Sequence, residues 1–172
     1  MFTLDQVQYL LSLPKYIYEN NDIVKMKRYD PLPFNERLFM LSEQDTDYLF
    51  FIDIFRSSKN MLKLSFHCQE KDAAIGLLRI DYGSSHKNPE ICADSVPGFL
   101  KPYAAQYIDE PHIHYYVEKY KNLVWALPLK ADKFPVKEYS KEKDFCDIIL
   151  SVATIINLKT ELFLQEALNY GD

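Results

Sequence analysis

Three strand-like segments in succession, between residues 48 and 82, limit the fold more than any other part of the chain. Segments 48–56, 61–68 and 73–82 are rich in aromatic and aliphatic residues, and short polar links separate them. In the second segment apolar and polar side chains alternate, which is typical of a strand with one buried face. Because such short links join antiparallel neighbours, the sequence predicts an antiparallel meander.

Helices are predicted at both ends of the chain. Thr3 and Gln6 have the spacing of a capping box, and Pro14 is expected to end or kink the first helix. Apolar residues at helical spacing predict a long C-terminal helix over residues 141–168, as one helix or two. The apolar side of this helix is expected to pack on the sheet.

A second hairpin is predicted in the C-terminal half. Segments 112–117 and 123–129 suit its two strands, and Pro128 suits the end of an edge strand. Segment 34–41 fits either a short helix or a strand. Together these elements predict one α+β domain over residues 1–172. Its antiparallel sheet would have about five strands, with the N-terminal helix and the long C-terminal helix packed on it.

Charge and cysteine content narrow the classes of function. A net charge of −5 without a long basic run makes nucleic acid a poor first choice of partner. The 3 cysteines form no close pairs, so a reducing compartment is expected rather than a disulfide framework. We see no secretory signal and no apolar run long enough to cross a membrane. A cytoplasmic protein is therefore expected, in the host cytoplasm if a phage encodes it.

The histidines are the main functional clue. Of the 4 histidines in the chain, three lie within residues 86–114. His112 and His114 are two residues apart on a predicted strand, so their side chains share one face. Two adjacent imidazoles can chelate one metal ion if a third ligand completes the site. Without a metal, they could act as an acid–base pair.

Polar residues on the predicted strand 73–82 are expected to join this cluster. The side chains of Arg79 and Asp81 point to the same face of that strand. If the strand pairs with the one that carries the two histidines, both side chains meet them there, together with Tyr116. The turn that follows would then bring His86 and Asn88 over the group.

Zinc is the expected metal, at about one ion per chain, because imidazole suits it. The candidate ligands are Asp81, His86, Cys92, His112 and His114. The supporting residues are Arg79, Asn88 and Tyr116. Asp94 or water could also be the fourth ligand, and Asp81 could instead orient a ligating imidazole. A closed site would be structural, whereas an open site with bound water would permit hydrolysis.

Four short motifs surround this cluster: Arg79-Ile80-Asp81, His86-Lys87-Asn88-Pro89, Pro111-His112-Ile113-His114 and Trp125-Ala126-Leu127-Pro128. As a set, R-x-D, H-x-N-P, P-H-x-H and W-A-x-P, they resemble an uncharacterised family of small bacterial and prophage proteins. The resemblance covers roughly residues 48–130. This family has no assigned activity, so functions follow from it only by analogy.

The resemblance implies two functions. The first is a phage inhibitor, because small acidic proteins of this kind are similar to anti-CRISPR proteins, whose partner is a type II RNA-guided nuclease with basic channels. A metal would then stabilise the fold of a non-enzymatic binder. The second is a metal-independent ribonuclease toxin of a toxin–antitoxin pair. His86, His112 or His114 would then be acid and base, and Arg79 would stabilise the phosphate.

A zinc-dependent hydrolase is a third possibility that the residues themselves leave open. We rank the inhibitor first, the ribonuclease second and the hydrolase third. Arg and Lys side chains around the histidines would favour the nuclease. A surface patch of acidic and Tyr residues would favour the inhibitor.

Overall fold

The structure, a computed structural model, describes residues 2–29, 35–60, 62–90, 93–140 and 142–164. The strands of its main sheet are β1 (Tyr16–Glu19), β2 (Asp22–Val24), β4 (Asn35–Leu41), β5 (Leu49–Arg56), β6 (Leu64–Glu70), β7 (Ile75–Tyr82), β10 (His112–Tyr115) and β11 (Trp125–Pro128). Two small sheets pair β3 (Met26–Tyr29) with β12 (Glu161–Leu164), and β8 (His86–Lys87) with β9 (Tyr107–Ile108). The helices are α1 (Leu4–Ser12) and α2 (Glu142–Ile155), with short 3-10 turns at Lys101–Tyr103 and Leu129–Ala131.

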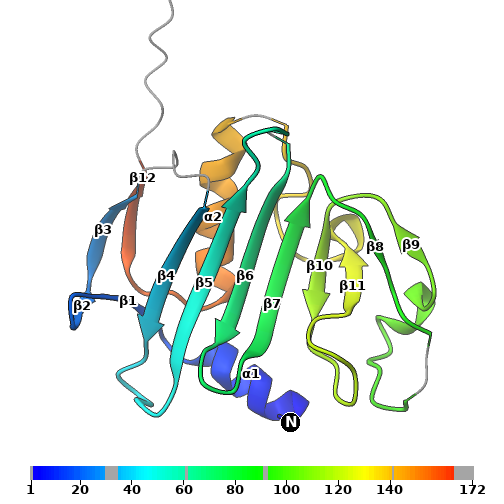
Figure 1. Ribbon diagram of the computed structural model, residues 1–172, viewed down its shortest axis with the longest axis horizontal. Coiled ribbons are helices and arrows are strands. Elements are labelled where there is room, and N and C mark those ends of the chain that lie inside the picture. The colour runs from blue at the N-terminus through cyan, green and yellow to red at the C-terminus, as the bar shows by residue number, and fades with distance from the viewer. Residues whose placement is uncertain (1, 30–34, 61, 91–92, 141, 165–172) are drawn as a thin grey trace, which may run out of the picture.

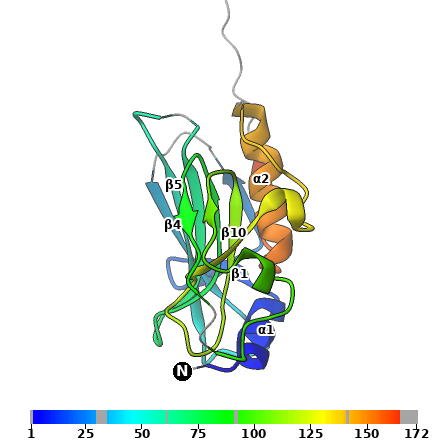
Figure 2. The same cartoon turned by 90° about the vertical axis from the view of Figure 1, so that its right-hand side faces the viewer.

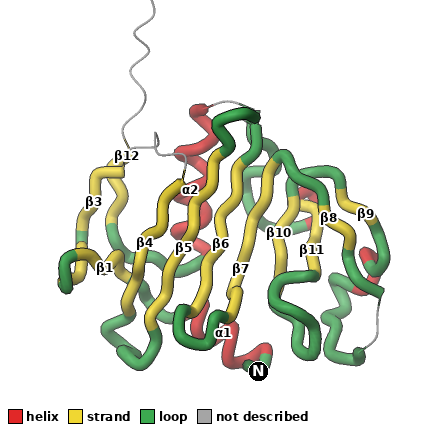
Figure 3. Tube along the Cα trace, in the orientation of Figure 1, coloured by secondary structure: helices red, strands yellow, loops and turns green. Residues whose placement is uncertain are grey.

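One broad sheet dominates the molecule (Figure 1). Its 8 strands have the order β11-β10-β7-β6-β5-β4-β1-β2, and each pair of neighbours is antiparallel. The predicted α+β class, with about five strands, is therefore wrong. Figure 3 shows that strands greatly exceed helices in the described part of the chain.

The prediction of a long C-terminal helix is also wrong, because α2 ends at Ile155. Its last turn is closed by a Schellman motif, in which the Leu158 amide donates to the Ala153 carbonyl at 2.8 Å. Asn157 takes the left-handed conformation that this motif requires, with φ of 56°. The chain then forms β12, which runs parallel to β3. Residues 165–168 of the predicted helix lie outside the described residues.

Several local predictions are confirmed. The meander is β5-β6-β7, and β10 pairs with β11, in which Pro128 ends the strand at the edge of the sheet. Thr3 and Gln6 form the capping box of α1, which ends before Pro14. The ambiguous segment 34–41 contains the strand β4. Neither helix of the described part of the chain is long and apolar enough to cross a membrane.

Both helices lie on the same side of the sheet (Figure 2). Alternate residues of the strands face them and form the core: Ile54, Phe66, Ile80 and Ile113, for example, are at most 3% exposed. The apolar side of α2 packs against this face, with the Phe145 ring 6.1 Å from that of Phe66. The other set of alternate residues forms a second face, over which no helix of the described residues lies (Figure 2). This helix-free face carries the predicted site.

Candidate metal site

The predicted neighbours are side by side. Strand β10 lies between β7 and β11, with His112 opposite Asp81 and His114 opposite Arg79. This pairing confirms the expected adjacency of the two strands. It also places the four side chains on the helix-free face, because their neighbours in sequence point into the core.

Asp81, His112 and His114 form a compact buried group, with exposed fractions of 2%, 0% and 3%. One potential ligand atom from each residue lies within 4.8 Å of the other two. The Asp81 Oδ2 atom is 3.1 Å from His114 Nε2 and 3.6 Å from His112 Nε2. In a tetrahedral zinc site with ligand distances of about 2.0–2.1 Å, neighbouring ligand atoms are about 3.3 Å apart. This group could therefore hold a metal ion. We call Asp81, His112 and His114 the triad.

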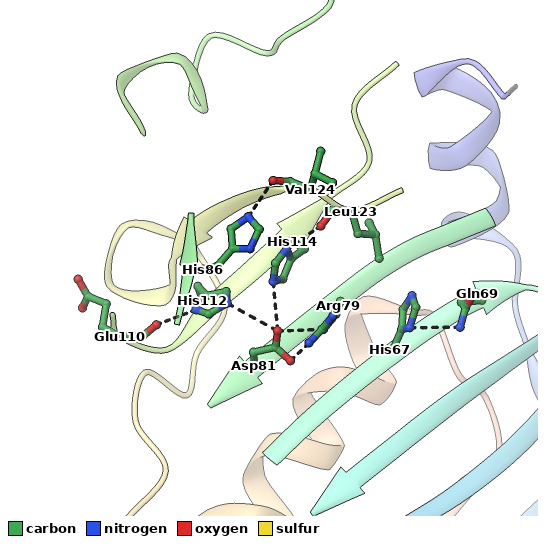
Figure 4. Close-up of polar contacts among 10 residues, drawn as sticks. All are labelled: His67, Gln69, Arg79, Asp81, His86, Glu110, His112, His114, Leu123 and Val124. Carbon is green, nitrogen blue, oxygen red and sulfur yellow. Dashed lines mark hydrogen bonds and ion pairs between the residues drawn. The ribbon is translucent and has the colours of Figure 1, made fainter. Parts of the chain in front are cut away.

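Hydrogen bonds to backbone carbonyls determine which ring nitrogen of each triad histidine is free to bind a metal. His112 Nδ1 donates to the Glu110 carbonyl at 2.8 Å, and His114 Nδ1 donates to the Leu123 carbonyl at 2.7 Å (Figure 4). A neutral imidazole has only one N–H, so both Nε2 atoms present lone pairs to the Asp81 carboxylate. A proton or a cation between these atoms would relieve their repulsion. Fixing the outer nitrogen in this way is typical of ligating histidines.

The pKa shifts agree with this arrangement. Burial opposes ionisation of Asp81, but a proton shared with the adjacent Nε2 atoms of His112 and His114, and the charge of Arg79, hold its pKa well below the usual range. Burial also lowers the pKa of His114, although the Asp81 carboxylate opposes this shift. The triad therefore combines an ionised carboxylate with an imidazole that burial keeps neutral, and both are the forms that bind metal.

His86 and Asn88 attach the following segment to the outer edge of β11. His86 Nε2 donates to the Val124 carbonyl at 2.8 Å, so its Nδ1 remains an acceptor. The Asn88 side chain accepts from the Ala126 amide at 2.7 Å and donates to its carbonyl at 2.8 Å. The His86 ring thereby lies over the triad, with its centroid 4.7 Å from that of His114 (Figure 4). Its burial lowers its pKa.

One predicted site residue, Tyr116, does not join the group. Tyr116 follows the end of β10, and its hydroxyl donates to the Phe2 carbonyl at 2.6 Å while its ring packs in the core. The structure therefore does not bring it to the histidines. Cys92 lies outside the described residues. Arg79, in contrast, lies beside the triad, with its Nε 2.9 Å from Asp81 Oδ2.

A pocket of about 490 Å³ opens over the triad, and it includes residues that the sequence interpretation missed. His67, the one histidine that the sequence did not place in the cluster, lines this pocket together with Lys63 and Ser65. It is paired with Arg79 across β6 and β7, in the same row as His114. Burial lowers its pKa. The alternation of β6 and its pairing with β7 were signals that could have placed His67 here.

A glycine at the end of β7 positions the segment that carries His86. Gly83 has φ of +63°, and a Cβ atom there would lie 2.5 Å from the Leu62 carbonyl oxygen. We expect Gly83→Ala to lower the free energy of unfolding by about 2–3 kcal/mol. Gly98→Ala is the matched control, because its Cβ would meet no described atom within 4 Å. Urea denaturation measures both, and equal losses would contradict the prediction.

The fold and the site together define the class of protein. It has a large antiparallel sheet and, below an open pocket, a buried group of two histidines and one carboxylate. The family of unknown function DUF6978 matches residues 2–158, and the chain belongs to this family. Comparison with curated proteins and with solved structures finds no match.

The family match agrees with the resemblance to an uncharacterised family and extends it beyond residues 48–130. It gives no support to the anti-CRISPR analogy. The inhibitor, toxin and hydrolase functions, and the nuclease partner, stay predictions.

Proposed function

We propose that this protein is a metal-dependent hydrolase of phosphoesters, with zinc bound by Asp81, His112 and His114. The observation that carries the proposal is the spacing of three buried ligand atoms at the base of an open pocket. Catalytic zinc sites use three protein ligands and keep a fourth position for water or substrate, whereas structural sites use four protein ligands. Zinc suits two imidazoles and a carboxylate, and it would supply a Lewis acid to the pocket.

The cationic side chains of the pocket support an anionic substrate. Arg79 and Lys63 both line it. The Arg79 side chain is 43% exposed, and only its Nε faces Asp81, so its other N–H groups are available to a ligand. A guanidinium in this position would stabilise the negative charge that develops on a phosphoryl group. Cations around the histidines favour a nuclease-type reaction over the inhibitor.

His86 is the candidate proton acceptor. Its Nε2–H is engaged by the Val124 carbonyl, and burial keeps the ring neutral, so Nδ1 can accept a proton. In the proposed reaction the oxygen of water bonds to phosphorus, and the P–O bond to the alcohol breaks. One proton of the water passes to His86, and the leaving oxygen takes up a proton from the solvent, to which His86 later releases its own.

The test compares bound zinc with hydrolysis of bis(p-nitrophenyl) phosphate in three proteins. We expect about one zinc per chain and release of nitrophenol by the wild type. His112→Ala should lose both properties, because it removes a ligand. His67→Ala is the matched control and should retain the zinc, because His67 lies in the same pocket but outside the triad.

Two results would contradict the proposal. Protein that binds no zinc and cleaves no ester would exclude a metal-dependent hydrolase. Protein that binds zinc, unfolds when the zinc is removed and cleaves no ester would identify a structural metal and return attention to a protein partner.

A further inference from the structure

Two rows of side chains cross the helix-free face and end at the triad. In one row Phe55, Ser65, Asp81 and His112 are successive partners on β5, β6, β7 and β10. In the other row Arg37, Asp53, His67, Arg79 and His114 are successive partners from β4 to β10. Strands lie about 4.8 Å apart, so Phe55 is about 10 Å from Asp81. The candidate metal site is therefore one end of a continuous surface.

Aromatic rings are exposed along this surface. Phe55 is 40% exposed and Phe39 is 37% exposed, although both are on strands in the middle of the sheet. Phe51 is the partner of Phe39 on β5, with its ring 6.2 Å from that of Phe39 and 4.1 Å from the Arg37 guanidinium. Phe55 also lines the pocket of the triad. Aromatic rings exposed on a sheet face that no described helix covers can stack on planar ligands.

The charges on this face differ from those of the whole chain. Arg37 and Arg79 lie in the second row, Lys63 lines the pocket and the Lys71 ammonium lies 5.9 Å from the Phe39 ring. The two acids of these rows are Asp53, which Arg37 neutralises through two hydrogen bonds, and Asp81, a proposed metal ligand. Within the two rows the arginines and the acids balance, and Lys63 and Lys71 lie beside them, so the net charge of −5 does not describe this surface.

We infer that this face binds single-stranded nucleic acid, RNA or DNA, with bases stacked on Phe39 and Phe55 and a phosphodiester placed at the triad. This inference rests on the proposed function, because it names the substrate of the same site. Exposed aromatic rings on a sheet, interleaved with Arg and Lys, are the means by which proteins hold unpaired bases and their backbone. A duplex hides its base faces, so it would meet only the cations.

Fluorescence anisotropy with a labelled 12-nucleotide oligo(dT), oligo(rU) and a duplex of the same length tests the inference. We expect both single strands to bind more tightly than the duplex, and stronger binding of oligo(rU) would identify RNA as the ligand. Phe55→Ala and Phe39→Ala should each weaken binding about 5- to 100-fold. Phe163→Ala is the matched control, because this residue is 45% exposed on β12, in a different sheet. Gel analysis shows whether the bound strands stay intact or are cleaved during the measurement.

The outcomes separate this inference from the proposed function. Hydrolysis of bis(p-nitrophenyl) phosphate without oligonucleotide binding would overturn the inference and leave the hydrolase in place. Binding that depends on Phe39 and Phe55 without hydrolysis of any ester would support the surface and overturn the hydrolase. If the protein binds heparin as tightly as the oligonucleotides, and the Phe variants bind both as the wild type does, the surface recognises polyanions in general. This result would overturn the inference.

Discussion

Lys15→Met is expected to lower the free energy of unfolding by about 3–5 kcal/mol. The Lys15 side chain is fully buried, and its Nζ donates to the carbonyls of Leu11, Leu13 and Ile156 at 3.0 Å each. These carbonyls belong to the C-terminal ends of α1 and α2, where unpaired acceptors and the helix dipoles favour a cation. Methionine has a similar length but would leave all three acceptors without a donor.

The measurement is urea denaturation followed by circular dichroism, with Lys121→Met as the control. Lys121 is exposed, so its replacement should change the stability by no more than about 0.5 kcal/mol. A loss below about 1 kcal/mol for Lys15→Met would show that water replaces the ammonium and that the two helix ends do not depend on it. The Lys15→Met variant thus measures how much the buried ammonium stabilises the packing of the two helix ends.

The centre of the sheet was predictable because its signals are local. Strands β5 to β7 are long, alternate clearly and are joined by short turns, so period and link length determine both their type and their pairing. Strands β1, β2 and β3 have only three or four residues each and show no period. Their formation depends on partners distant in sequence, so a single sequence could not reveal them.

The end of α2 shows a second reason why prediction from the sequence failed. Leu162 continues the helical spacing of the apolar residues before it, but Leu162 and Leu164 also have the two-residue spacing of a strand. The helix ends in a Schellman motif with Asn157 in the position that glycine usually takes. No Gly or Pro marks this end in the sequence, so the periodicity alone predicted too long a helix.

The triad was predictable in part because it needs only the period of two on each strand and one strand pairing. His112 with His114, and Arg79 with Asp81, share a face by alternation, and β7 and β10 are neighbours as expected. Tyr116 was misplaced because β10 ends at Tyr115, and alternation does not continue beyond the strand. Phe55 belongs to this surface only through the register of several pairs, which the sequence did not provide.

Asp81→Asn is expected to weaken zinc binding by at least about 100-fold, because loss of a direct ligand exceeds the effect of losing an outer-shell partner. Asparagine preserves the shape of the side chain but removes the charge that would face the cation. A 100-fold change in affinity corresponds to about 2.7 kcal/mol. Zinc that stabilises the wild type against heat should therefore give a much smaller rise in melting temperature in this variant.

The matched control is Asp53→Asn, on the same face and in the lining of the same pocket. The Asp53 carboxylate accepts two hydrogen bonds from Arg37, at 2.6 and 2.7 Å, and lies outside the triad. Its replacement should leave zinc affinity unchanged, as measured by competition with a chromogenic chelator. Equal losses in the two variants would mean that zinc responds only to the overall charge of the face. Loss in Asp81→Asn alone requires direct coordination, because, of these two carboxylates, it is Asp81 that has both histidine Nε2 atoms within 3.6 Å.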